Sequence, residues 1–377
     1  MDSKKVLVIG LASAYGGIES FFINVFRNID KTKIKFDFIT FFPVCAYEDE
    51  LEAAGCKIYH VTRRGSNPIK NYLELTSFFK THGNEYDYVW YHTSSSSNVE
   101  PLVISKKYCN AKTIVHCHGT NFESSAIARP VHIMLQKINF EKMKKNTDYP
   151  FACSKAAGNY LFKDEFGKVI VVNNGIDIDS YVYNKDVRNL VRNEIGVSSS
   201  TVVIGHAGRL CEVKNQKFLI EAFAEYQKVN PDSILVIAGE GELKAQLAAQ
   251  ANEFNVSEKV MFLGYRNDLN RLVQGFDIFM LPSFSEGFPV SLIESQAAGL
   301  SCLVSDVVTN EVLITDLVTF ESLDNCAEVW AKRIEEIVKN KSYLRNNFDY
   351  SANVRSAGFD VKDNAKIIEN FFIKAGE

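Results

Sequence analysis

Short apolar runs rich in β-branched residues alternate with helical patterns along the whole chain. Each run ends at glycine or polar residues, and apolar residues spaced three or four apart then follow. This alternation predicts βαβ units, which build parallel sheets covered by helices. The expected strands are Lys5–Ile9, Phe36–Phe41, Lys57–Val61, Tyr88–Tyr91, Lys112–His118, Tyr149–Cys153 and Val169–Val172 in the first half, and Val202–Ala207, Ile234–Ala238, Val260–Leu263, Ile278–Leu281 and Cys302–Ser305 in the second.

The chain is long enough for two domains, because 377 residues exceed the usual size of one hydrophobic core. The last strand expected in the first half leads into Asn173-Asn174-Gly175-Ile176-Asp177-Ile178-Asp179, a stretch typical of a linker. We therefore expect two α/β domains, each with a doubly wound parallel sheet, over residues 1–175 and 176–356.

Composition and charge argue against several classes of function. A formal net charge of −4 makes a nucleic acid an unsuitable main partner. The sequence has no run of eighteen apolar residues and no charged-then-apolar leader, so we expect a cytoplasmic protein without a membrane span. The eight cysteines form no C-x-x-C pair, which favours reduced thiols over a zinc site.

Two glutamates flank a predicted strand-to-helix turn in the second half. Glu286 follows the apolar run Phe276–Pro282, and Glu294 lies about a turn and a half into the next helix. Pro289 is expected at the first helical position. In open α/β sheets, ligands bind at this carboxyl edge of the strands. The N–H groups of Phe288–Ser291 would suit a phosphate, and a carboxylate can accept hydrogen bonds from both hydroxyls of a ribose.

Positively charged residues that could bind a phosphate occur at another strand-to-helix turn. Arg209 and Lys214 follow the strand expected at Val202–Ala207 and precede a helix expected over about Asn215–Val229. A guanidinium and an ammonium together can neutralise a diphosphate, so we expect no metal ion there.

These motifs, in their order and spacing, resemble those of the family 4 retaining glycosyltransferases, which have the GT-B fold. The matching residues are Gly208-Arg209-Leu210, Lys214-Asn215, Glu286-Gly287-Phe288-Pro289 and Glu294. The resemblance extends over nearly the whole chain. It implies two Rossmann-like domains facing each other across a cleft. A last helix, about Val361–Ala375 within the C-terminal segment of about 357–377, would pack back on the first domain.

The resemblance also implies an activity. A hexosyl unit would pass, with retention of configuration, from a nucleoside-diphosphate sugar, expected to be a UDP-sugar, to a glycan or lipid-linked saccharide. The second domain would bind the donor and the first the acceptor, in synthesis of capsule or another cell-surface polysaccharide. No cofactor is expected. Two routes to retention stay open: a double displacement through a carboxylate, and a front-face route in which the leaving phosphate takes the acceptor's proton.

The resemblance assigns roles to individual residues. Arg209 and Lys214 would stabilise the departing diphosphate, and Glu286 would bind sugar hydroxyls near the reacting carbon. His118 matches a family histidine that touches the transferred sugar, and it completes the expected catalytic set. The base is expected near residues 264–266. The residues expected at the donor are Gly16, Gly17, Gly208, Gly264, Tyr265, Arg266, Gly287, Phe288, Pro289, Val290, Ser291 and Glu294.

Glycines and polar residues also mark strand ends in the first half. Gly16 and Gly17 begin a helix without completing the G-x-G-x-x-G pattern, and they form either a loop facing the donor phosphates or a plain turn. His116 shares a strand face with His118, but a metal site lacks a further visible ligand, so His116 is expected in the core or behind His118. The serine-rich stretch His92–Asn98 is either an acceptor contact or a solvated loop.

Two further segments each allow two interpretations. Residues 129–146 contain five basic residues and one acidic residue between apolar ones. This helix either lies on an anionic membrane surface, at the inner face of the plasma membrane, or covers the sheet as an ordinary crossover helix. Asp177 and Asp179 resemble the Asp-x-Asp metal motif of GT-A enzymes, but the resembled family has an interdomain turn there, so we expect no metal.

Two other functions remain open. A sugar-nucleotide epimerase of GT-B fold would share the cleft without needing a large acceptor surface. A non-catalytic partner subunit would keep the fold while losing the charged site residues. The chain contains these residues, Arg209, Lys214, Glu286 and Glu294, which favours an enzyme.

Overall fold

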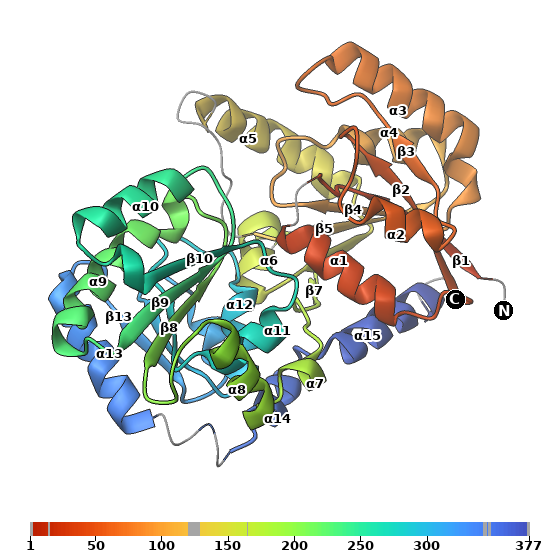
Figure 1. The fold of residues 1–377 in the computed structure, drawn as a ribbon. Coiled ribbons are helices and arrows are strands. Elements are labelled where there is room, and N and C mark those ends of the chain that lie inside the picture. The colour runs from red at the N-terminus through yellow and green to blue at the C-terminus, as the bar shows by residue number, and fades with distance from the viewer. Residues whose placement is uncertain are drawn as a thin grey trace. The chain divides into compact units, whose positions relative to one another are not determined.

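The computed structural model describes residues 3–13, 16–119, 129–163, 165–341, 345 and 348–374 (Figure 1). The chain divides into two compact units, Met1–Gly175 with Val361–Glu377 (unit 1) and Ile176–Asp360 (unit 2). Each unit is built around one parallel sheet. The final residues of the expected C-terminal helix, 375–377, lie outside the described part.

Unit 1 contains a seven-stranded sheet in the order β3-β2-β1-β4-β5-β6-β7, and all of its pairings are parallel. The strands are β1 (Lys4–Ile9), β2 (Ile34–Thr40), β3 (Ile58–His60), β4 (Tyr88–Thr93), β5 (Lys112–Cys117), β6 (Tyr149–Ala152) and β7 (Ile170–Val171). The helices are α1 (Gly17–Asn28), α2 (Glu48–Ala53), α3 (Pro68–His82), α4 (Glu100–Tyr108), α5 (Arg129–Lys145), α6 (Lys155–Phe162) and α15 (Val361–Lys374).

The last helix, α15, packs on the same face of this sheet as α1. Ile368 and Phe372 belong to the buried cluster that also contains Phe22. The Tyr88 hydroxyl donates to the Phe372 carbonyl over 3.2 Å. The helix begins at Val361, as expected, after a turn with glycine at a φ of +84° that separates it from the preceding helix.

Unit 2 contains a six-stranded parallel sheet in the order β10-β9-β8-β11-β12-β13. The strands are β8 (Val202–Ala207), β9 (Ser233–Ala238), β10 (Val260–Gly264), β11 (Ile278–Leu281), β12 (Ser301–Ser305) and β13 (Val318–Glu321). The helices are α7 (Ile178–Tyr181), α8 (Lys185–Glu194), α9 (Gln216–Val229), α10 (Lys244–Glu253), α11 (Leu269–Leu272), α12 (Val290–Ala297), α13 (Ala327–Lys341) and α14 (Ser351–Ser356).

The alternation predicted from the sequence is confirmed, with strand boundaries that differ by at most two residues. The structure contains the two doubly wound parallel sheets that this alternation predicts. β13 has no counterpart among the predicted strands. β13 lies at the sheet edge, and its residues are mostly half-buried. A strand in this position does not need the continuous apolar run that marks a central strand, and its sequence has none. None of the helices in the described ranges has the length and apolar character needed to cross a bilayer.

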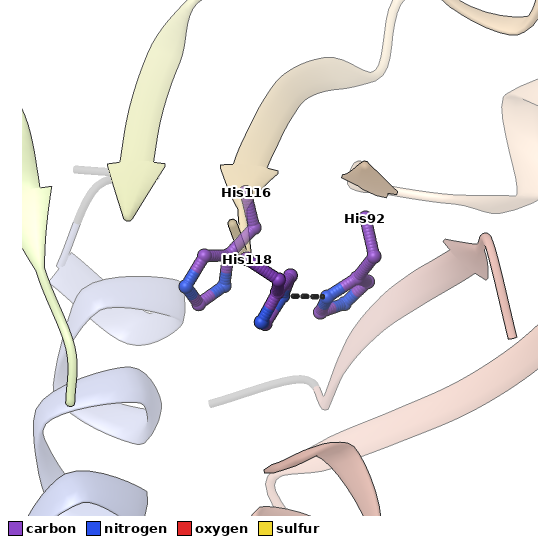
Figure 2. A group of neighbouring side chains, drawn as sticks. All are labelled: His92, His116 and His118. Atoms are coloured by element: carbon purple, nitrogen blue, oxygen red, sulfur yellow. Dashed lines mark hydrogen bonds between the residues drawn. The ribbon is translucent and has the colours of Figure 1, made fainter. Parts of the chain in front are cut away.

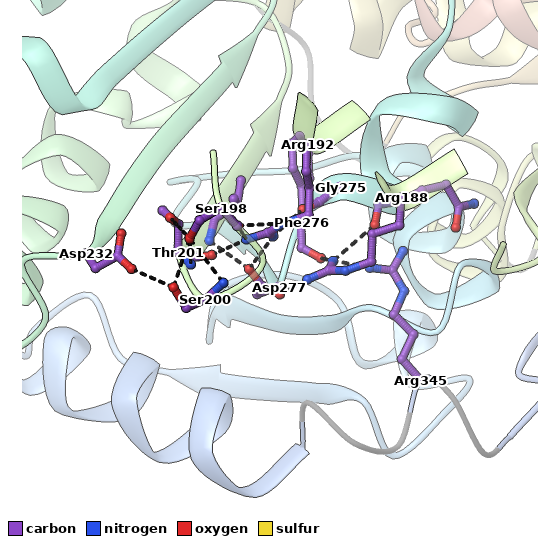
Figure 3. A network of polar contacts seen from close by, with 12 residues as sticks. Arg188, Arg192, Ser198, Ser200, Thr201, Asp232, Gly275, Phe276, Asp277 and Arg345 are labelled. Atoms are coloured by element: carbon purple, nitrogen blue, oxygen red, sulfur yellow. Dashed lines mark hydrogen bonds and ion pairs between the residues drawn. The ribbon is translucent and has the colours of Figure 1, made fainter. Parts of the chain in front are cut away.

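The amino end of β11 is anchored by a cluster of arginines (Figure 3). Arg188 and Arg192 both contact the carboxylate of Asp277, at 2.5 and 3.0 Å. Arg345 donates to the carbonyls of Val273, Gln274, Phe276 and Ala298. These bonds join α8, β11 and the segment after α13 at the sheet edge opposite the carboxyl ends of the strands, and a cavity of about 280 Å³ lies beside them.

Candidate functional site

The strand order of unit 2 has its switch point between β8 and β11, where ligands bind in open α/β sheets. The loops that follow these two strands are bonded to each other. The Phe284 N–H donates to the Val213 carbonyl over 2.8 Å, and the Asn215 side chain donates to the Pro282 carbonyl over 3.0 Å. Asn215 has a left-handed φ of +53°, which turns the loop into α9.

Lys214 and Glu286 meet at this switch point. The Lys214 ammonium donates to both carboxylate oxygens of Glu286 over 2.8 Å. The Ser283 hydroxyl donates to one of the same oxygens over 2.5 Å. The Glu286 side chain is only 7% exposed and that of Lys214 is 21% exposed, so both are held in place and an anion can still reach the ammonium.

Arg209, the other expected cation, extends away from this pair. Its guanidinium lies 3.2 Å from the Glu242 carboxylate, and both side chains are mainly exposed. An exposed pair of this kind is weak, because water screens it. Arg209 lies at the carboxyl edge of the sheet. Because its ion pair is weak, a bound ligand can change the orientation of its side chain.

Glycines bring three strand-end loops into backbone contact. A Cβ on Gly239, whose φ is +144°, would lie 1.9 Å from the Gly208 carbonyl oxygen. The Gly239 N–H donates to the Gly264 carbonyl over 2.8 Å. Beyond Gly264, Tyr265 is 56% exposed. Arg266, also expected near the base, is bonded through its guanidinium to the carboxylates of Asp268 and Glu194.

Helix α12 begins at Val290, and Pro289 is its N-cap residue. The prediction of Pro289 at the first helical position is wrong by one residue, because its ψ of 96° is extended. Gly287, Val290 and Ser291 lie around this helix start, where N–H groups have no partner within the helix. The Phe288 ring is buried and stacks on Phe359 at 5.3 Å, so only its backbone is available to a ligand.

Glu294 lies in the second turn of α12 and is bonded to α7. The Tyr181 hydroxyl donates to one Glu294 oxygen over 2.6 Å. Burial raises the pKa of Glu294 to about 7, and the bond from Tyr181 opposes this shift. Burial and the neighbouring carboxylate also raise the pKa of Tyr181 well above its ordinary value. The second oxygen of Glu294 remains for a ligand hydroxyl.

In unit 1, the loop after β1 is fixed by Glu19. Its carboxylate accepts from the N–H groups of Ala12 and Gly16 over 2.8 and 3.2 Å. Nothing described lies within 4 Å of a Cβ placed on Gly17, so this helix start is open. Gly10, at a φ of +123°, lies so close to β4 that a Cβ would be 2.4 Å from the His92 carbonyl oxygen.

Three histidines gather at the same edge of unit 1 (Figure 2). His92 Nδ1 lies 2.8 Å from His118 Nε2, and the rings of His116 and His118 are 4.2 Å apart. The potential ligand atoms of the three lie within 4.8 Å of one another. Burial lowers the pKa of His118 to about 3 and that of His92 and His116 well below the ordinary value, so all three are neutral. The sequence singled out His116 and His118 but not His92 as part of this cluster.

The serine-rich loop after β4 is not a freely solvated loop. Ser95 and Ser96 are buried. The Ser96 hydroxyl donates to the Gln136 carbonyl of α5 over 3.2 Å, and the Asn139 amide of the same helix donates to the Ser97 carbonyl over 3.0 Å. The loop therefore anchors α5 at the carboxyl edge of the sheet.

The two linker aspartates have separate surroundings. Asp179 contacts Arg355 over 2.6 Å, and the Asp177 carbonyl accepts from Ser180 at the start of α7. The described residues offer no third ligand that would bring this pair into a metal-binding group.

The fold matches the GT-B architecture of solved glycosyltransferase structures. The solved structure of Anabaena Alr3699/HepE in complex with UDP matches it with a TM-score of 0.77, at 18% identity over 98% of this chain and 99% of that one. The structure of WaaG, a glycosyltransferase involved in lipopolysaccharide biosynthesis, matches with a TM-score of 0.74, at 16% identity over 98% and 100% of the two chains. At these identities the likeness shows the fold.

Sequence relatives agree with the fold. Residues 187–355 match the family of glycosyl transferases group 1, a segment that lies within unit 2. The putative glycosyltransferase EpsF of Bacillus subtilis (strain 168) is 29% identical over 379 residues, 98% of this chain and 97% of that protein. The UDP-Gal:alpha-D-GlcNAc-diphosphoundecaprenol alpha-1,3-galactosyltransferase of Escherichia coli is 28% identical over 319 residues, 80% of each protein. Unit 2 thus carries a glycosyltransferase group 1 domain.

Proposed function

We propose that this protein is a retaining glycosyltransferase that transfers a hexosyl unit from a nucleoside-diphosphate sugar to a saccharide. The observation that carries the proposal is the Lys214–Glu286 pair at the switch point of unit 2. A solved structure of the same fold holds UDP-glucose, so we infer a UDP-sugar donor. Relatives over most of the chain are named glycosyltransferases.

Different residues of unit 2 would contact different parts of the donor. The amide groups at the start of α12, with Lys214 and Arg209, would stabilise the charge that develops on the departing diphosphate. Glu294 would accept from the ribose hydroxyls with the oxygen that Tyr181 leaves available. Glu286 would bind sugar hydroxyls, and the backbone around Gly264 would contact the base. Because lysine and arginine supply the positive charge, we propose that no metal ion takes part.

The surroundings of Glu286 favour a front-face route to retention. In that route the bond from the anomeric carbon to the diphosphate oxygen breaks, the acceptor oxygen bonds to the same face, and its proton passes to the leaving phosphate. A double displacement needs a carboxylate free to attack the anomeric carbon. Both oxygens of Glu286 accept from Lys214, and one also accepts from Ser283, which reduces their nucleophilicity.

We propose that unit 1 binds the acceptor and that His118 contacts the transferred sugar. The acceptor would be a glycan or a lipid-linked saccharide, because α5 has an apolar surface suited to a membrane. Val131, Met134 and Ile138 follow one another at helical spacing and are each more than half exposed. Lysines at the end of this helix would face anionic lipids. The protein would then act on the cytoplasmic side of the plasma membrane, in cell-surface polysaccharide synthesis.

An epimerase or a non-catalytic subunit has less support. The relatives that align over most of this chain are named as transferases, and the four charged residues expected at the donor site, Arg209, Lys214, Glu286 and Glu294, are present in unit 2. Products formed with and without acceptor would separate an epimerase from a transferase.

Thermal unfolding with UDP, GDP, ADP and their sugar conjugates, with and without magnesium, tests the donor site. Ligands that bind the folded state raise the unfolding midpoint. We expect one nucleotide to raise it equally with and without magnesium, and Glu294→Ala to abolish the rise. Glu258→Ala, an exposed substitution in the same unit, serves as the control. A rise that requires magnesium would contradict the metal-free proposal, and no rise with any nucleotide would contradict the donor site.

A further inference from the structure

We propose that His92 is a positioning residue, which fixes the tautomer and the orientation of His118 through a hydrogen bond between the two neutral rings. This inference rests on the proposed transferase function for the role of His118, but the bond itself can be tested without any substrate. Neither the sequence motifs nor the relatives assign a role to His92.

Strand register brings the three histidines together. His92 on β4 is the direct neighbour of His116 on β5. His118 lies two residues after His116, on the same face of the chain. Phe21 of α1 covers the group, with its ring 4.8 Å from His116 and 5.1 Å from His118. In Figure 2 the bond from His92 to His118 is the contact drawn between the rings.

The surroundings keep the rings uncharged. His92 and His116 are 2% and 0% exposed. His92 Nε2, His118 Nδ1 and both nitrogens of His116 have no hydrogen-bond partner of ordinary geometry among the described residues, so no carboxylate of that part of the chain stabilises an imidazolium. A buried charge without a partner is costly, and the neutral forms are therefore favoured.

One hydrogen lies between His92 Nδ1 and His118 Nε2. When His118 donates it, Nδ1 of His118 keeps a lone pair, and when His92 donates it, Nδ1 of His118 carries a hydrogen. That Nδ1 atom is buried and has no hydrogen-bond partner among the described residues, so in our proposal it is the nitrogen that meets a sugar hydroxyl when the site is occupied. His92 therefore decides whether His118 accepts a hydrogen bond from the sugar or donates one.

A metal ion explains the same cluster less well. Tetrahedral zinc ligands at 2.0–2.1 Å from the metal lie about 3.3 Å from each other, whereas His92 and His118 approach to 2.8 Å, a hydrogen-bond distance. Metal-binding histidines usually donate their second N–H to a carboxylate or carbonyl. His92 Nε2 and His118 Nδ1 have no such acceptor among the described residues.

The experiment compares His92→Asn with His92→Phe, because the asparagine amide can replace Nδ1 and the phenyl ring cannot. Nitrogen-15 NMR of histidine-labelled protein reads the tautomer, and the protein has only seven histidines. His118→Gln assigns the signal. We expect one fixed tautomer of His118 in the wild type and in His92→Asn, and a mixture in His92→Phe. His116→Phe, which alters packing but not the bond, should keep the wild-type signal.

Kinetics and metal content complete the test. With a working donor and acceptor, His92→Phe should lower kcat at least tenfold with little change in donor KM, and His92→Asn should restore kcat to within about threefold of the wild type. A fixed His118 tautomer in folded His92→Phe, or equal loss of kcat in both variants, would overturn the proposal. Stoichiometric zinc in the purified protein would replace it with a metal site. Absence of transfer with a normal NMR result would instead count against the transferase function.

Discussion

The ammonium of Lys214 lies 2.8 Å from both carboxylate oxygens of Glu286, although 72 residues separate the two in sequence. Lys214 ends the loop after β8, and Glu286 lies in the loop after β11. Each charge neutralises the other while the site is empty, which keeps two long side chains ordered. A diphosphate that arrives at the start of α12 would then meet a cation already in place, so little rearrangement is needed during the reaction.

Lys214→Met should lower kcat about a hundredfold or more, because it removes a donor that stabilises developing negative charge. It should also lower the unfolding midpoint, since Glu286 would keep a buried charge without its partner. Initial rates and thermal unfolding measure the two effects. Lys217→Met removes an exposed lysine of the adjoining helix and should leave both near wild type. Equal effects of the two substitutions would show that Lys214 has no special role.

Binding of UDP should release a proton near neutral pH. Burial raises the pKa of Glu294 to about 7, so half of the molecules carry a protonated carboxyl there at that pH. Ribose hydroxyls that donate to the carboxylate favour its charged form and lower this pKa. Calorimetry in two buffers of different ionisation enthalpy counts the protons. Glu294→Gln controls for the titration of the phosphate itself, and identical proton release in both proteins would contradict the assignment.

The same carboxyl should influence stability. Its pKa in the folded state lies above the ordinary value of 4.5, so the folded protein binds more protons than the unfolded chain between about pH 4.5 and 7. This group therefore makes the free energy of unfolding fall as pH rises through that window. Urea unfolding at several pH values should show a smaller fall for Glu294→Gln than for the wild type. A larger fall in the variant would reverse the sign and contradict the shift.

Asp277→Asn should destabilise unit 2 by about 3–5 kcal/mol, because Arg188 and Arg192 would lose their shared carboxylate (Figure 3). Nucleotide binding should persist under conditions where the variant is folded, since Asp277 lies at the amino end of β11. Asp232→Asn, an exposed residue of the same region, should change stability by about 0.5 kcal/mol or less. Urea unfolding and nucleotide titration provide the measurements. An Asp277 variant as stable as the control would show that carbonyl groups alone satisfy the arginines.

Membrane attachment through α5 predicts a loss of vesicle binding in the double variant Met134→Glu with Ile138→Glu. Each side chain contributes about 1.5–3 kcal/mol when fully buried, so partitioning to vesicles with anionic lipid should fall at least tenfold. Sedimentation with vesicles measures it. Leu190→Glu alters an equally exposed apolar residue of α8 and should bind like the wild type. Unchanged binding of the double variant would leave α5 as an ordinary helix of unit 1.

Local patterns were enough to predict the order of strands and helices, and to place the candidate site residues of unit 2 at strand-to-helix turns. The alternation of apolar runs defines the two parallel sheets, and the spacing of Glu286 and Glu294 places one in a loop and the other in α12. These features depend on neighbours within about a dozen residues, which is the range over which helix and strand periodicity acts. The edge strand β13 was not predicted, because a half-buried edge strand has no such periodicity.

Contacts between distant residues became visible only in the folded chain. Tyr181 reaches Glu294 across 113 residues, and His92 meets His118 across 26 because of the register between β4 and β5. In α5, Val131, Met134 and Ile138 are exposed whereas Met143 is buried in the core of unit 1, a division that the spacing of its apolar residues did not predict. Periodicity identifies which side chains share a face of an element, but sheet order and packing decide which faces meet, and those depend on the whole chain.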